Sequence, residues 1–407
     1  MIKANDLIRH PSSINLGIGL PGSAGAVLIV TPWYGGTGGG VAVNTETLAG
    51  ALTRASIDVV VVLLQGTPGH PTGIGRFSEP IIPIVAYGQE VYARGIKGIV
   101  GYHLRAALAH RTLQRIIHEH GIRIAHLHYA VPAYRPIIDS LNRLGIPTVL
   151  TFRGSDAHQV VTGSGPYHEI NRIAERASYI TAVSDGLLDT VLDRFPVTRG
   201  RACAIPNSAP LDIWDALDLN EQAPARDIDI LFVGNLRWVK GPDILLDSFQ
   251  RVLSIRPTCR LYFVGSGDME AQLRATAKDA GITDKMVFYG RAQRDEISNI
   301  YRRSRILAVP SRDEGFSLVA VEAQLNGTPV IGTNVGGIPQ AVRHGHTGML
   351  VRAEDPGAMA DAILTLLSDE EQWRQLSTNA CSWARDTFSP DTLTSRYLEL
   401  YHRLIHP

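Results

Sequence analysis

Short, continuously apolar segments alternate with longer amphipathic segments along most of the 407-residue chain. This alternation predicts βα units, because a short apolar segment is typical of a buried strand and a longer amphipathic one of a helix packed on a sheet. The apolar segments do not alternate with polar residues, which indicates burial on both faces, as in doubly wound parallel sheets. The expected strands are Ala26–Thr31, Ile57–Leu64, Ile124–His128, Thr148–Phe152, Tyr179–Val183, Asp229–Val233, Arg260–Val264, Met286–Tyr289, Ile306–Val309 and Pro329–Gly332, with helices such as Asn44–Arg54 and Tyr134–Leu144 between them.

The strands fall into two series, so the sequence predicts two α/β domains, as its length also favours. The stretch from Pro206 to Arg226 between the series contains prolines and acidic residues without periodicity, which is typical of a linker. Ligands of doubly wound sheets bind at the carboxyl ends of the strands, so we expect a cleft there between the domains. The expected boundaries are an N-terminal domain at 1–210, a linker at 211–226, a C-terminal domain at 227–390, and a final helix at 391–407 that packs back on the first domain.

The charge balance and the cysteines exclude several classes of function. Lys plus Arg and Asp plus Glu both total 39, so nucleic acid, which needs a basic excess, is not an expected partner. Cys203, Cys259 and Cys381 form no C-x-x-C pair, so neither a disulfide framework nor a zinc site is predicted. No apolar run is long enough to span a bilayer, and no signal peptide is visible. We expect a soluble, cytoplasmic protein.

One segment of the second half has the chemistry of an anion site. Within Ser311–Ala323, a strand is expected to run into a loop, and a helix is expected to begin near Ser317. A helix start offers free backbone N–H groups and a positive dipole end, which suit a diphosphate. Glu314 before the helix and Glu322 inside it would then flank the anion with hydroxyl-binding carboxylates, and a sugar nucleotide has that layout. Taken alone, the two glutamates are explained equally well as solvated surface charges.

Four motifs of the second half occur in a familiar order. They are Phe232–Gly241, Phe263–Gly267, Glu314–Glu322 and Gly336–Gln340. Their order and spacing resemble the retaining glycosyltransferases numbered family four (glycosyl transferases group 1), and the resemblance continues into the first half. It implies the GT-B fold, in which two doubly wound, Rossmann-like domains face each other across a deep cleft. The first domain would bind the acceptor and the second the nucleotide-sugar donor.

The resemblance implies donor-binding roles for residues of the Glu314–Glu322 motif. Glu314 matches a glutamate that contacts the hydroxyls of the donor sugar, and Glu322 matches one that binds the ribose. Backbone amides around Phe316, Ser317 and Leu318 would meet the phosphates.

Further donor contacts are implied around the strand-end motif and the first-domain loop. Lys240 matches a lysine that neutralises the diphosphate, whereas the arginine expected directly after the glycine is replaced by Asn235. Arg237 is therefore predicted to supply the missing charge, and Glu314, Lys240 and Arg237 are the predicted catalytic residues. Gly39 and Gly40 match a loop that faces the donor phosphates.

Three residues of the first half are candidates for the acceptor side. Arg153 stands where many relatives carry a histidine. Because arginine stays charged and only donates, Arg153 is predicted to bind a phosphate or the acceptor and not to act as an acid or base. Asp156 is a candidate for positioning the acceptor, although a helix N-cap would explain it equally well. His128 ends an expected strand and would line the cleft, with a hydrogen-bonded strand histidine as the alternative.

A glycine-rich stretch, Gly35–Val41, follows the first expected strand and invites a dinucleotide interpretation. No G-x-G-x-x-G pattern passes through it, because Val41 occupies the last glycine position, and no acidic ribose partner follows the second strand. A nicotinamide enzyme is therefore a weak alternative.

Residues 94–123 form a basic segment with regular apolar positions. Such a segment is typical of an amphipathic surface that contacts anionic membranes, as in some relatives, and the inner face of the cell membrane is then an expected location. An ordinary helix packed on the sheet is the alternative. The basic residues are Arg94, Lys97, Arg105, Arg111, Arg115 and Arg123, with Glu119 as the one acid.

The resemblance implies a retaining hexosyltransferase. It would move a hexose from a UDP- or GDP-sugar to a hydroxyl of a glycan, a lipid-linked acceptor or a small molecule, in polysaccharide, glycolipid or glycoside synthesis. In front-face attack the leaving diphosphate takes the acceptor's proton, so catalysis would rest on positioning and charge stabilisation. No Asp-x-Asp motif lies near the site, so no metal or other cofactor is expected. The alternatives are a non-catalytic GT-B nucleotide-sugar-binding protein, favoured by Asn235 and Arg153, and a sugar-nucleotide epimerase.

Overall fold

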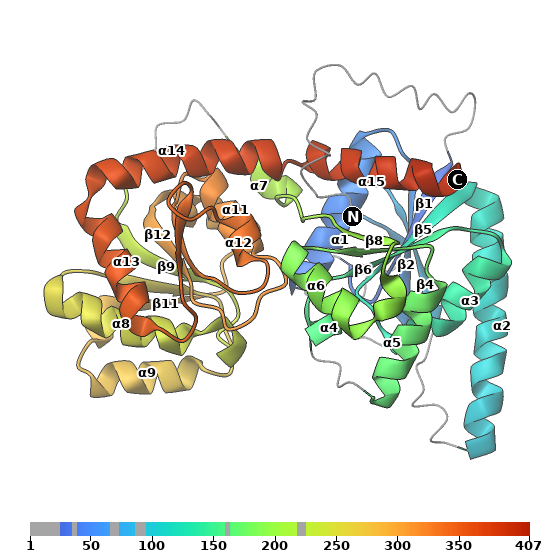
Figure 1. Cartoon of the computed structure of the whole chain (residues 1–407), viewed down its shortest axis with the longest axis horizontal. Coiled ribbons are helices and arrows are strands. Elements are labelled where there is room, and N and C mark those ends of the chain that lie inside the picture. Colours follow the sequence, from blue (N-terminus) through green and yellow to red (C-terminus); the bar gives the residue numbers. More distant parts are fainter. Residues whose placement is uncertain (1–24, 35–38, 66–72, 86–94, 159–162, 218–224) are drawn as a thin grey trace. The chain divides into compact units, whose positions relative to one another are not determined.

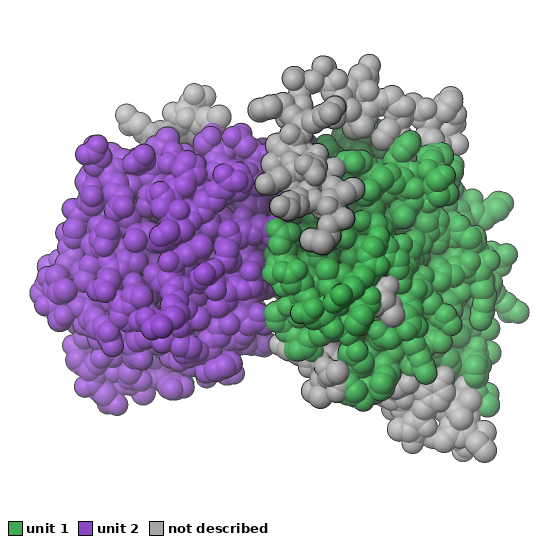
Figure 2. Space-filling view, viewed as in Figure 1, with its two compact units in different colours: residues 1–206, 393–407 green, residues 207–392 purple. Residues whose placement is uncertain are grey.

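The computed structural model of the chain describes residues 25–34, 39–65, 73–85, 95–158, 163–217 and 225–407 (Figure 1). The chain divides into two compact units, Met1–Pro206 with Leu393–Pro407, and Asn207–Thr392 (Figure 2). Each unit contains one sheet whose strands are parallel except at one edge of the first. The predicted fold class, two doubly wound α/β domains, is confirmed.

In the described part of the first unit, the sheet has eight strands in the order β3-β4-β2-β1-β5-β6-β7-β8. Its direction of winding reverses between the neighbours β1 and β5, and ligands bind at such a reversal in doubly wound sheets. The strands are β1 (Ala26–Thr31), β2 (Val59–Gln65), β3 (Gly73–Ile74), β4 (Pro80–Val85), β5 (Ile122–His128), β6 (Thr148–Phe152), β7 (Tyr179–Ala182) and β8 (Ala202–Ala204).

Helices cover both faces of this sheet, which is why every residue of β1 is buried. Helix α1 (Gly39–Arg54) and the C-terminal helix α15 (Pro390–Ile405) contribute to one core, in which Leu48 and Tyr397 join Ile29 of the sheet. The opposite face carries a row of helices (Figure 1). The helices of the row are α2 (Gly95–His120), α3 (Arg135–Arg143) and α5 (Gly165–Arg176), and the shorter α4 (Ser155–His158) and α6 (Asp185–Arg194) follow β6 and β7.

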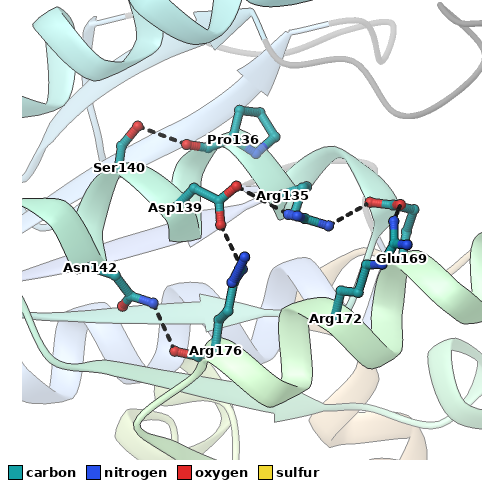
Figure 3. Close-up of polar contacts among 8 residues, drawn as sticks. All are labelled: Arg135, Pro136, Asp139, Ser140, Asn142, Glu169, Arg172 and Arg176. Carbon is teal, nitrogen blue, oxygen red and sulfur yellow. Dashed lines mark hydrogen bonds and ion pairs between the residues drawn. The ribbon is translucent and has the colours of Figure 1, made fainter.

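Charged side chains join helices α3 and α5 (Figure 3). Asp139 accepts from Arg135 at 3.0 Å and from Arg176 at 2.8 Å. Glu169, which is only 5% exposed, pairs with Arg135 at 3.5 Å and with Arg172 at 3.0 Å. Arg135 therefore bridges two carboxylates, and the network fixes one helix against the other.

Among the residues described for the second unit, six parallel strands form a sheet in the order β11-β10-β9-β12-β13-β14, which reverses between β9 and β12. The strands are β9 (Ile228–Val233), β10 (Leu261–Val264), β11 (Met286–Gly290), β12 (Ser304–Val309), β13 (Val330–Thr333) and β14 (Gly348–Val351). The helices are α7 (Leu211–Asp215), α8 (Pro242–Ile255), α9 (Glu270–Asp279), α10 (Arg294–Arg302), α11 (Leu318–Leu325), α12 (Ile338–Ala341), α13 (Pro356–Ser368) and α14 (Glu370–Thr387).

The segment predicted as a linker at 211–226 begins with helix α7. Its Leu211 and Ile213 are buried, and the unit boundary lies between Pro206 and Asn207. A helix of five residues is too short to show a periodic pattern, which is why the sequence favoured an irregular segment. The part at 218–224 lies outside the described residues.

Candidate functional site

Two loops meet at the carboxyl edge of the second unit's sheet. Strand β9 leads into the 3₁₀ turn η5 (Trp238–Lys240), and β12 leads into the loop 310–317. Since β9 and β12 are neighbours at the reversal point, the loops that follow them come together, and the backbone N–H of Arg312 donates to the Val239 carbonyl at 2.9 Å. This is the edge where a doubly wound sheet binds ligands.

The two loops bring Lys240 and Glu314 into contact. Lys240 Nζ donates to Glu314 Oε2 at 2.6 Å, although 74 residues separate them in the chain. The side chains are 31% and 13% exposed, so solvent still reaches both. An ammonium has three N–H donors and a carboxylate accepts several hydrogen bonds, so the pair retains capacity for phosphate and hydroxyl groups of a ligand.

Two glycines hold the backbone of Glu314 and Lys240 in place. Gly241, with φ of 66°, lies where an added Cβ would come within 2.1 Å of the Pro310 carbonyl oxygen. Gly336, with φ of 51°, lies where a Cβ would come within 2.0 Å of the Glu314 carbonyl oxygen, and Gly337 donates its N–H to that oxygen at 2.8 Å. Both positions need the left-handed region and lack room for a side chain, so only glycine fits.

Arg312 is a residue of this site that the sequence did not reveal. Its guanidinium donates two hydrogen bonds to Asp243, at 2.8 and 2.7 Å, and also pairs with Glu354. It donates to the Trp238 carbonyl at 2.6 Å and lies 4.4 Å from the centre of the Trp238 ring. The side chain is 10% exposed, and its charge is matched by two carboxylates.

Arg312 therefore ties the loop of Glu314 to the turn η5 that carries Lys240. Burial raises the pKa of Asp243, but the hydrogen bonds and charge of Arg312 outweigh burial, and the pKa of Asp243 lies below its ordinary value. The partners Asp243 and Glu354 are 69 and 42 residues away, so no local pattern could have indicated the cluster.

The start of helix α11 presents a buried hydroxyl, that of Ser317. Ser317 is the N-cap residue, yet its side chain makes no capping bond. Its hydroxyl belongs to a side chain that is 1% exposed, and it has no hydrogen-bond partner among the described residues. Phe316 anchors the segment by packing edge-on against Phe388, with ring centres 5.6 Å apart. The Leu318 N–H donates to the Phe316 carbonyl at 3.2 Å, and the N–H groups that follow it in the first turn lack intrahelical acceptors, so the helix start suits an anion.

Glu322 lies inside α11 and is held by a tyrosine of the preceding helix. Tyr301 Oη donates to Glu322 Oε2 at 2.8 Å. Tyr301 is fully buried, and burial together with the charge of Glu322 raises the pKa of its phenol well above the ordinary value. Tyr301 therefore stays protonated and remains a donor.

Asn235 and Arg237 lie on the exposed part of the loop before η5. The Arg237 N–H donates to the Asn235 carbonyl at 2.8 Å, and the Lys240 N–H donates to the Arg237 carbonyl at 2.9 Å. The turn thus fixes the backbone of Arg237 beside that of Lys240, while its long side chain extends into solvent. That Arg237 supplies the charge missing at Asn235 stays a prediction.

The three acceptor-side candidates lie together in the first unit, at the carboxyl ends of β5 and β6. The Asp156 carboxylate accepts from the backbone N–H groups of Ala130 at 2.9 Å, Arg153 at 2.9 Å and Gly154 at 2.8 Å. Asp156 thereby joins the loops after the two strands. Because Asp156 lies inside α4 and accepts from N–H groups that precede it in the chain, it is not the helix N-cap that was the alternative to positioning the acceptor.

The guanidinium of Arg153 contacts Nδ1 of His128. Because arginine only donates, Nδ1 must accept and the ring proton must sit on Nε2. Burial lowers the pKa of His128 well below its ordinary value, and the neighbouring His126 and Arg153 lower it further, so His128 is neutral. His126 is bonded in turn to Tyr401 of α15 at 2.6 Å. His128 is therefore a buried, hydrogen-bonded strand histidine.

Gly39 and Gly40 open helix α1 and are both exposed. An added Cβ would meet nothing within 4 Å at either position, so close packing does not require glycine there. Gly39 has φ of 61°, which favours glycine for conformational reasons. The preceding residues of the glycine-rich stretch, 35–38, lie outside the described part.

Two features are absent from the described parts of the chain, a membrane-spanning helix and a cluster of metal ligands. None of the helices there is long and apolar enough to cross a membrane. No group of three or more His, Cys, Asp and Glu side chains there is arranged to hold a metal ion.

Two family models match consecutive parts of the chain. Residues 217–383 match the model described as glycosyl transferases group 1, and residues 38–213 match the one described as glycosyltransferase family 4. The chain belongs to the family-four glycosyltransferases. The family that the four sequence motifs indicated is thereby confirmed.

Individual relatives agree with this assignment. The D-inositol 3-phosphate glycosyltransferase 1 of Catenulispora acidiphila is 27% identical over 393 residues, which are 91% of this chain and 92% of that protein. The D-inositol 3-phosphate glycosyltransferase of Corynebacterium glutamicum is 36% identical, but over 182 residues, so the match spans only 43% of that relative and 43% of this chain. The Anabaena protein HepE, solved in complex with UDP, superimposes with a TM-score of 0.69 at 19% identity, covering 93% of this chain and 100% of that one. The likeness confirms the GT-B fold of this family-four chain.

Proposed function

We propose that this chain is a retaining glycosyltransferase that moves a hexosyl group from a UDP- or GDP-sugar to a hydroxyl acceptor. The observation that carries the proposal is the contact between Lys240 and Glu314 beside the start of α11, where the buried Ser317 hydroxyl has no partner among the described residues. Structures of Anabaena HepE with UDP and with UDP-glucose support a nucleotide-sugar donor.

In this proposal, residues of the second unit bind the donor and stabilise the leaving group. The diphosphate binds at the start of α11, and Glu322 binds the ribose. Glu314 binds hydroxyls of the hexose. When the bond between the sugar and the diphosphate breaks, negative charge grows on the leaving oxygen, and the Lys240 ammonium with the helix N–H groups stabilises it. Arg237 adds a second positive charge.

The acceptor hydroxyl would attack on the face that the diphosphate leaves. Its oxygen forms the new bond to the anomeric carbon, and its proton passes to the departing diphosphate, so the configuration is retained without a protein base. Arg153 is the cation of the first unit that would bind an anionic acceptor. The names of the Catenulispora and Corynebacterium relatives make inositol 3-phosphate the first such acceptor to try.

The test is a transfer panel. Purified protein is incubated with UDP-, GDP- and ADP-hexoses, with and without acceptors that include inositol 3-phosphate, and products are resolved by NMR. We expect one nucleoside diphosphate to be released in an acceptor-dependent reaction, with the anomeric configuration of the donor kept. Tight donor binding without turnover would instead establish the non-catalytic alternative, and a changed sugar without acceptor would establish the epimerase.

Transfer is expected to be insensitive to chelators. The Lys240 ammonium and the start of α11 already supply positive charge where a divalent ion would act in a metal-dependent transferase. Initial rates are measured after dialysis against EDTA and after adding back Mg²⁺ or Mn²⁺. A rate that falls on chelation and returns with the metal would contradict metal independence.

The same proposal includes contact with an anionic membrane through one face of helix α2. Val100, Leu104 and Leu108 are 61%, 61% and 53% exposed and recur every fourth residue. Arg111 and Arg115 are exposed further along the helix, and at about 100° per residue all five fall within a stripe of about 80°. An apolar stripe continued by basic residues fits an interface of acyl chains and anionic headgroups.

The double substitution Leu104→Gln with Leu108→Gln is expected to weaken vesicle binding about tenfold, since each partly buried leucine contributes about 0.7 kcal/mol. Cosedimentation with phosphatidylglycerol vesicles, and with phosphatidylcholine vesicles as the neutral reference, measures the effect. Ile255→Gln is the matched control, because Ile255 is 67% exposed but belongs to α8 of the second unit. Equal binding of the double variant and the unaltered protein would rule out this face.

A further inference from the structure

Helix α10 contributes the fully buried hydroxyl of Tyr301 to the second unit. It donates to Glu322 Oε2 at 2.8 Å, from the last turn of α10 to the middle of α11. The backbone of Tyr301 is fixed as well, because its carbonyl accepts from Thr328 Oγ1 at 2.6 Å. Tyr301 is therefore fixed at its hydroxyl and at its backbone, in a place that solvent does not reach.

This bond has a consequence for the carboxylate. A free glutamate samples many rotamers, and fixing it costs conformational entropy. The hydrogen bond from a rigid, buried phenol restricts the carboxylate before any ligand arrives. A carboxylate has about four acceptor positions, and the bond from Tyr301 does not use all of them.

We infer that Tyr301 is a positioning residue that makes Glu322 selective for the ribose of the donor. The inference rests on the proposed function, in which Glu322 binds the ribose hydroxyls. The carboxylate accepts from these hydroxyls only while the phenol holds it in the required orientation. Tyr301 itself touches no substrate, and its effect is confined to the discrimination between nucleotides with and without ribose hydroxyls.

The test compares nucleotides that differ only in these hydroxyls. The probes are UDP and GDP and their 2′,3′-dideoxy analogues, and their dissociation constants are measured by calorimetry. The unaltered protein should bind the preferred ribonucleotide at least about tenfold more tightly than its dideoxy analogue, as expected for hydrogen bonds to a charged group. In Tyr301→Phe the preference should fall below about threefold, while affinity for the dideoxy analogue stays the same. In Glu322→Gln the preference should disappear.

Tyr167→Phe is the matched control, because its hydroxyl donates to the Arg194 carbonyl at 2.8 Å within the first unit. It should keep the full preference, and thermal unfolding checks that all variants are folded. The positioning role is refuted if Tyr301→Phe keeps the preference for the ribonucleotide while Glu322→Gln loses it. It is also refuted if Tyr301→Phe weakens the binding of the ribonucleotide and of its dideoxy analogue equally. If Glu322→Gln also keeps the preference, or if no nucleotide binds the unaltered protein, the proposed donor site itself is refuted.

Discussion

Glu314→Gln is expected to lower kcat for transfer by about 10² to 10³-fold, the range found when one preorganised polar group is removed from an active site. The carboxylate accepts from Lys240 Nζ at 2.6 Å. A glutamine at this position has one acceptor oxygen, and its NH₂ group cannot accept from the ammonium. Lys240 would lose its ionic partner, and the hydroxyls of the donor sugar would lose an ionic acceptor. The measurement is the rate of donor consumption with the donor and acceptor that prove active in the transfer panel.

The fold should survive this substitution, because Glu314 is partly exposed and its backbone is held by Gly336 and Gly337. Thermal unfolding therefore accompanies the kinetics. Glu370→Gln is the matched control. Glu370 pairs with Arg305 at 2.7 Å at the opposite edge of the same sheet, where β12 begins. Turnover of the Glu314 variant within about threefold of the unaltered protein would contradict a role for this carboxylate in transfer.

The ten strands predicted from the sequence all occur, with ends shifted by two residues or fewer. Their continuous apolar character follows directly from burial on both faces, so one sequence suffices to find them. Strand β4 was missed because Pro80 and Pro83 lie within it and prolines argue against a strand. It pairs on one side with β2 and on the other only with the two-residue β3, so few ladder bonds are required of it.

The candidate site was predictable where a contact follows from the order of the strands and not where it depends on how individual side chains pack. Lys240 and Glu314 follow neighbouring strands at the reversal of the sheet, and the structure brings them into contact. The contact of Tyr301 with Glu322 could not be predicted, because a tyrosine in a short apolar pattern is typical of any protein core. His128 shows the opposite problem. Its place at a strand end suggested that it lines a cleft, whereas the structure buries it completely against Arg153.

Arg312→Lys is expected to lower kcat/KM about 10 to 100-fold although residue 312 need not touch the substrate. Lysine keeps the charge but cannot form the paired bonds to Asp243 or stack on Trp238 as a planar guanidinium does. The turn η5 then loosens against the loop of Glu314, and small displacements of catalytic groups are enough to cause losses of this size. Steady-state kinetics with both substrates varied measure the effect.

Arg303→Lys separates this positioning effect from the general loss of an arginine. Arg303 also makes paired bonds to a carboxylate, that of Asp227, but at the edge of the sheet where β9 and β12 begin. It should leave kcat/KM unchanged.

The stability lost in Arg312→Lys should also depend on pH. Because the folded-state pKa of Asp243 lies below its ordinary value, the pair with Arg312 stabilises the fold above about pH 4, and this contribution is lost as the pH falls through the folded-state pKa. The difference in unfolding free energy between the variant and the unaltered protein should therefore be largest near neutral pH and shrink in acid. A difference that stays constant down to acid pH, or equal kinetic losses in both lysine variants, would show that Arg312 does not hold the two loops together.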